Sequence, residues 1–84
     1  MTLANVPAGG SFRVVKVRLN RETGKRLADM GFISNVSGAV VRTGFLGGPL
    51  QVRIMGYDAL IRRFEASGID VEVPAGESEK DGVK

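Results

Sequence analysis

Apolar and polar residues alternate with a period of two along the middle of the chain. From Leu50 to Ile54 every second residue is apolar, whereas the intervening Gln51 and Arg53 are polar. This alternation is typical of a strand that packs one face and exposes the other to water. Together with the strand-forming residues around it, the pattern predicts three strands in close succession, at residues 39–46, 50–55 and 59–64.

Two glycine-containing links join these three strands and predict a β-meander. The first link is residues 47–49 (GGP) and the second is residues 56–58 (GYD). Glycine supplies the positive φ that tight hairpin turns require. A small barrel built on such a meander offers a surface for contact and little room for catalysis.

Two more strands are predicted on either side of the meander. Residues 11–18 favour a first strand, in which the adjacent Val14 and Val15 interrupt the alternation and indicate a bulge. Near the other end of the chain, residues 65–68 predict one helical turn, and residues 69–73 predict a last strand that ends before a proline.

A short helix is predicted at residues 20–30, between the first strand and the meander. Asn20 or Thr23 would cap its start, and Gly31 would follow its end in the left-handed conformation. Apolar residues of this helix and of the strands are expected to form the core, namely Leu27, Met30, Ile54, Ile61, Ile69 and Val71.

These elements together predict a mainly β fold. We expect a small, partly open β-barrel of about five strands, with the short helix between strands 1 and 2 and the helical turn before the last strand. The domain is expected at residues 1–73. Residues 74–84 are small and charged, and they are predicted to form a disordered tail.

Composition limits the chemistry that this chain can perform. Its 84 residues include neither cysteine nor histidine. Disulfides, thiolate and imidazole metal ligands, and Ser-His or Cys-His catalysis are therefore excluded. No cluster of carboxylates is evident in the sequence. We accordingly expect a protein that is not an enzyme, with no cofactor and no metal site of its own.

The charge of the chain favours an acidic partner surface. The formal net charge is +3, and residues 1–73 carry ten basic and six acidic side chains. This excess is too small to suggest nucleic-acid binding. No apolar run is long enough to span a membrane, and the first residues lack the features of a signal peptide. A cytoplasmic protein without direct membrane insertion is expected.

The first predicted hairpin link carries an unusual pair of large apolar residues. A hairpin tip is normally polar, yet Phe45 and Leu46 immediately precede the glycines, and Pro49 follows them. These side chains could fold back to cap the end of the barrel, or they could anchor a partner. In the second interpretation, Met55 and Tyr57 would widen the same patch.

Basic residues form a second candidate surface. Arg42, Arg53, Arg62 and Arg63 are expected on adjacent strands, and Lys25 and Arg26 would extend this surface from the helix. The arginines could form a solvated face, or they could pair with carboxylates on a partner and set its orientation.

Several short motifs, taken in their order and spacing, resemble the FeoA family. They are residues 26–32 (RLADMGF), 48–50 (GPL), 56–57 (GY) and 65–71 (EASGIDV). The resemblance extends from about Val6 to Val73. Two departures stand out, because members usually have Pro-Gly where this chain has Ser34-Asn35, and a branched apolar residue where it has Gly38. Asn35 tolerates the left-handed conformation, and Gly38 suggests a bulge or a thinner core layer.

The resemblance implies an SH3-like β-barrel with a non-enzymatic role. Members of this family are accessory or regulatory proteins of ferrous iron uptake, with transition-metal binding known at the level of the family. The implied partner is the cytoplasmic part of the FeoB-type ferrous iron transporter, which would recruit the protein to the inner face of the membrane. A monomer or a weak homodimer is expected, since open sheet edges often pair.

Two other functions fit a barrel of this kind. SH3-like barrels also bind nucleic acid, although that role calls for more basic residues beside exposed aromatic ones, and most phenylalanines here are expected to be buried. A metal- or peptide-sensing module is the other alternative, as in similar barrels fused to metal-dependent repressors.

Overall fold

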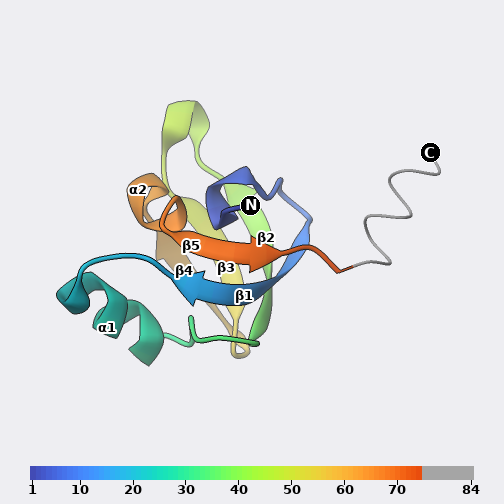
Figure 1. Cartoon of the computed structure of the whole chain (residues 1–84). Helices are drawn as coiled ribbons and strands as arrows, with labels where there is room; N and C mark the ends of the chain where they lie inside the picture. Colours follow the sequence, from blue (N-terminus) through green and yellow to red (C-terminus); the bar gives the residue numbers. More distant parts are fainter. Residues whose placement is uncertain (75–84) are drawn as a thin grey trace.

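The structure, a computed structural model, describes residues 1–74 (Figure 1). Of the predicted tail at residues 74–84, all but Pro74 lies outside the described residues. The described part contains five strands, two α-helices and two short 3₁₀ turns. In chain order these are η1 (Leu3–Asn5), β1 (Ser11–Val17), α1 (Arg21–Asp29), β2 (Ser37–Thr43), η2 (Phe45–Gly47), β3 (Leu50–Ile54), β4 (Tyr57–Ile61), α2 (Arg63–Ala66) and β5 (Ile69–Glu72).

The five strands form one antiparallel sheet in the order β4-β3-β2-β1-β5. β1 and β5 lie in front of the other three strands in Figure 1, so the sheet curls around its core without closing. The N-terminal segment covers the outer edge of β5, where Thr2 forms a bridge with Asp70 and the Val71 N–H donates to the Met1 carbonyl at 2.9 Å. The predicted mainly β, partly open fold is confirmed.

The core forms where the alternating faces of the strands meet the apolar residues of the helices. Five of the six predicted core residues are buried, whereas Met30 is only partly buried. The predicted bulge in β1 is also present, because the pairing with β5 shifts register between Val14 and Lys16. The buried core consists of Leu3, Val6, Phe12, Val14, Leu27, Phe32, Val40, Leu50, Val52, Ile54, Ile61, Ala66, Ile69 and Val71.

Helix α1 is one residue shorter at each end than the predicted range 20–30, because Asn20 and Met30 are its caps. The Asn20 side chain accepts a hydrogen bond from the Thr23 N–H at 2.8 Å, which caps the helix start. Gly31 follows the helix end with a φ of 110°. Leu27 is fully buried and holds α1 against the rest of the molecule. A predicted left-handed turn is likewise confirmed at Asn35, with a φ of 76°.

The turn between β3 and β4 is shorter than the predicted link at residues 56–58. Ile54 pairs directly with Tyr57, so the turn consists of Met55 and Gly56, with φ angles of 55° and 84°. Two residues with positive φ match the twist of the flanking strands, which is why this two-residue turn is favoured. Tyr57 and Asp58 therefore belong to β4.

The segment after β4 becomes helical earlier than predicted. The Glu65 Oε1 accepts a hydrogen bond from the Arg62 N–H at 3.0 Å, so α2 begins at Arg63 and contains Phe64, which the sequence assigned to a strand. Glu65 is 3% exposed, and its second carboxylate oxygen pairs with Arg26 of α1. This buried carboxylate thus connects the two helices.

Gly38 lies in a regular part of the sheet, opposite Phe12 on one side and Ile54 on the other. The expectation of a bulge or a thinner core layer at this position is wrong. A Cβ atom on Gly38 would lie only 2.8 Å from Cζ of the fully buried Phe12. The phenyl ring occupies the space that a branched side chain would otherwise fill.

Candidate interaction surface

The hairpin between β2 and β3 presents two large apolar side chains to solvent. Phe45 and Leu46 are each 88% exposed, so the alternative in which they cap the end of the barrel is wrong. This hairpin projects beyond the sheet, at the top of Figure 1. An exposed Phe-Leu pair at a projecting tip is the kind of feature that marks an interaction site.

The backbone of this loop is closely packed at Gly44 and strained at Leu46. Gly44 packs against the segment that leads into β3 so closely that a Cβ atom there would lie 2.5 Å from the carbonyl carbon of Gly48. Leu46 has φ 53° and ψ 49°, in the left-handed region, which costs a leucine about 1 kcal/mol or more. No burial of Leu46 compensates for this strain, and such strain concentrates at functional sites.

A shallow hollow of about 400 Å³ lies beside the base of this loop. Its lining combines the loop with the end of β4 and the start of α2: Gly47, Gly48, Pro49, Leu60, Arg62 and Arg63. Leu60, which is 67% exposed, was missed as a site residue. The sequence signal that could have identified Leu60 is a break in the alternation of apolar and polar residues. Ala59 and Ile61 face inward, so a polar residue would be expected at the position between them. We call Phe45, Leu46, Pro49, Leu60, Arg62 and Arg63 the tip surface.

The structure divides the predicted basic surface into separate parts. Arg42 lies on β2 and Arg53 on β3, but Arg62 follows β4 and Arg63 begins α2, so the expectation of adjacent strands is wrong for the last two. The cause is the early start of α2. Lys25 and Arg26 are exposed on α1, which lies at the opposite end of the molecule from the hairpin tip in Figure 1.

Met55 and Tyr57 do not widen the tip surface. Met55 lies in the β3–β4 turn and Tyr57 is the first residue of β4, at the end of β3 opposite to Pro49. The Tyr57 hydroxyl donates to the Met30 carbonyl at the end of α1, and Met55 packs against Gly31. Met55 is 63% and Tyr57 is 45% exposed, so these two residues form a separate exposed patch beside the end of α1.

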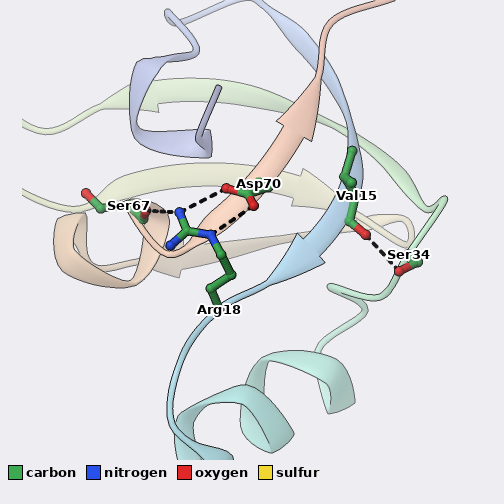
Figure 2. Close-up of polar contacts among 5 residues, drawn as sticks. All are labelled: Val15, Arg18, Ser34, Ser67 and Asp70. Carbon is green, nitrogen blue, oxygen red and sulfur yellow. Dashed lines mark hydrogen bonds and ion pairs between the residues drawn. The ribbon is translucent and has the colours of Figure 1, made fainter.

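The two carboxyl groups with shifted pKa values are explained by arginines of the same molecule. Arg18 donates twice to Asp70, at 2.9 Å each, and also contacts the Ser67 carbonyl at 3.5 Å (Figure 2). These bonds lower the pKa of Asp70. The pKa of Asp58 is lowered by hydrogen bonds from Arg53, at 2.7 Å and 3.1 Å, and from Gln51 at 2.8 Å.

The Arg18–Asp70 pair connects the segment before α1 to β5. On the other side of α1, the Ser34 hydroxyl donates to the Val15 carbonyl at 2.9 Å (Figure 2). Both contacts hold the two ends of the segment that contains α1 against the sheet. The shifted acids therefore have a structural explanation, and neither is tuned toward neutral pH as a general acid or base would be.

We expect the two arginine-bound acids to make stability depend on pH. Because the pKa of each is lower in the folded chain, their contribution is present above the ordinary value of 3.8 and is lost as pH falls through the lowered pKa. The thermal unfolding midpoints of wild type and of an Asp58→Asn/Asp70→Asn variant should differ most well above pH 3.8 and converge as pH falls through the lowered pKa values. A constant difference across this range would contradict the assignment.

Residues 1–74 contain no group of three acidic side chains placed to hold a metal ion. Within the same residues, no helix has the length and apolarity needed to cross a membrane. What the geometry does supply is a closely packed loop with exposed apolar side chains, next to a hollow with two arginines. This arrangement is suited to contact with another macromolecule.

Comparison with known proteins assigns this fold to a family. The FeoA domain matches residues 1–73. A protein of Porphyromonas gingivalis described as an Fe(2+) transport protein A/Fe(2+) transporter FeoB fusion protein is 33% identical over 73 residues. That alignment covers 87% of this chain and only 9% of the fusion protein.

Solved structures agree with this assignment. The NMR structure of FeoA from Chlorobium tepidum has a TM-score of 0.85 at 34% identity, covering 90% of this chain and 72% of that one. FeoA of Stenotrophomonas maltophilia, complexed with zinc and described as an SH3 domain protein, has a TM-score of 0.76 at 29% identity, covering 86% and 89%. We conclude that this chain belongs to the FeoA family, which is linked to ferrous iron transport.

Proposed function

We propose that this protein is a non-enzymatic accessory factor of ferrous iron uptake that binds the cytoplasmic part of a FeoB-type transporter. The observation that carries the proposal is the tip surface, with Phe45 and Leu46 each 88% exposed on a tightly constrained loop. Aromatic and aliphatic anchors of this kind dominate the energetics of protein interfaces. Binding would recruit the protein from the cytoplasm to the inner face of the membrane.

The fusion protein of Porphyromonas gingivalis supports the choice of partner. Its description joins an Fe(2+) transport protein A with a FeoB transporter in one polypeptide. Covalent linkage raises the effective concentration of two modules for each other, which is useful where they bind. Where the FeoA-type protein and the transporter are separate chains, as proposed here, their interface must be strong enough to bind without covalent linkage.

The proposal is tested by calorimetric titration of this chain with the cytoplasmic part of a FeoB-type transporter from the same genome. We expect saturable one-to-one binding that weakens as salt is raised from about 50 to about 300 mM, because the net charge of +3 steers the chain toward an acidic surface. Absence of association at every salt concentration would refute the proposed function.

A further inference from the structure

Two arginines of the tip surface have no counter-ion in the part of the chain that the structure describes. The ion pairs found there use four other arginines, namely Arg13, Arg18, Arg26 and Arg53. Arg62 is exposed and makes no side-chain hydrogen bond within the described residues. Guanidinium groups pair with carboxylates more strongly than with neutral groups, so two unpaired arginines side by side are notable.

The environment of Arg63 is the more informative of the two. Its guanidinium reaches only two backbone carbonyls, Ala4 at 3.4 Å and Gly48 at 3.3 Å, both at the long limit of a hydrogen bond. Its Nε is buried and has no hydrogen-bond partner. A half-buried cation that is this poorly satisfied gains from any anion that reaches the hollow it lines.

The sheet edge that borders the hollow is open. In the β3–β4 hairpin, Ile54 and Tyr57 close the two-residue turn as a hydrogen-bonded pair, and such pairs recur at every second residue. The backbone N–H and C=O groups of Tyr57, Ala59 and Ile61 therefore point toward β3. The N–H and C=O groups of Asp58 and Leu60 therefore point away from the sheet. No described segment pairs with this edge, in contrast to the edge of β5, which the N-terminal segment covers.

We propose that the free edge of β4 and the adjoining hollow form a docking site for an extended, acidic segment of a partner. The segment would add an edge strand by bonding to the backbone of Asp58 and Leu60. A carboxylate on it would pair with Arg62 and Arg63, and an apolar residue two positions away would lie on Leu60 and Pro49, because alternate residues of a strand share a face. This inference rests on the proposed function and specifies how the transporter would be recognised.

Charge complementarity favours a foreign segment over a second copy of this chain. Antiparallel pairing of two β4 strands would bring only one carboxylate to the edge, that of Asp58. This group is already bound by Arg53 and Gln51 of its own chain. Paired in this way, the β4 strand of a second copy would leave Arg62 and Arg63 without a counter-ion.

A pair of short peptides tests the inference without the transporter. The probe is acetyl-Thr-Thr-Glu-Thr-Leu-Thr-Thr-amide, and its twin carries Gln in place of Glu. We expect the Glu peptide to shift amide NMR signals of Gly48, Leu60 and Arg62, with a dissociation constant at least about tenfold below that of the twin. Equal affinity of the two peptides, shifts confined to other surfaces, or no shift at millimolar peptide would each overturn the inference.

Variants of the 84-residue chain separate this inference from the proposed function. Arg62→Glu should weaken binding of both the Glu peptide and the transporter domain about tenfold or more, whereas the matched exposed control Arg21→Glu should leave both unchanged. Transporter binding that survives Arg62→Glu would overturn this inference alone. Peptide binding without transporter binding would overturn the proposed function alone. Slow exchange of the Leu60 amide in a dimer of the free chain would show that a second copy occupies the edge, against the inference.

Discussion

Replacement of both Phe45 and Leu46 by serine is expected to weaken binding to the cytoplasmic part of a FeoB-type transporter by about thirtyfold or more. Removal of a central apolar anchor typically costs an interface at least about 2 kcal/mol, which corresponds to this factor. The same replacement should leave the thermal unfolding midpoint nearly unchanged, because each side chain is 88% exposed and contributes little to the core. Calorimetric titration and a thermal melt of the same preparation measure both quantities.

The matched control for this variant is Ile33→Ser. Ile33 is another exposed aliphatic side chain, at 49%, and it lies in the turn between α1 and β2, whereas the tip lies between β2 and β3. We expect it to reduce binding less than about threefold, since it lies outside the tip surface. Weak binding by Ile33→Ser together with normal binding by the Phe45/Leu46 variant would show that the interface includes Ile33 and not the tip surface.

Those features of the fold that local rules determine could be predicted from the sequence. The alternation from Leu50 to Ile54 gave the correct buried face, and Asn20 and Gly31 marked the limits of α1. In each case the controlling interaction lies within a few residues of the chain. Periodicity and helix capping are therefore readable without knowledge of the fold.

Features that depend on tertiary context were placed less accurately. The two-residue turn puts Met55 in the left-handed conformation, which its residue type does not suggest. The start of α2 depends on Glu65, whose burial and pairing with Arg26 involve a helix from a distant part of the chain. The contact of Glu65 with Arg62 is local, but the contact with Arg26 that accompanies its burial becomes apparent only in the folded chain.

The candidate site likewise combines features that could be predicted from the sequence with features that could not. The apolar pair at residues 45 and 46 was apparent from the sequence, because large apolar residues are unusual at a hairpin tip. Its exposure could not be decided there, nor could its separation from Met55 and Tyr57. The hollow beside Leu60 and the unsatisfied guanidinium of Arg63 arise only when β4, α2 and the loop meet.

Gly38→Val is expected to destabilise the fold by about 3 kcal/mol or more. A Cβ at this position would lie 2.7 Å from the Arg53 carbonyl oxygen and 2.8 Å from Cζ of Phe12. The carbonyl belongs to a paired strand and the ring is fully buried, so neither can move without a loss of pairing or packing. A decrease of the urea midpoint by at least about 1 M is expected in equilibrium unfolding.

Two further variants test whether this loss comes from the clash with Phe12. Gly24→Ala, in α1, is the matched glycine control: its nearest neighbour would be the Leu19 carbonyl at 3.9 Å, so we expect about 0.5–1 kcal/mol of stabilisation instead. Adding Phe12→Leu to Gly38→Val should recover part of the lost stability, because a smaller side chain gives the new methyl groups some of the space that the ring now fills. Wild-type stability of Gly38→Val alone would mean that the ring does not occupy the place of the missing side chain.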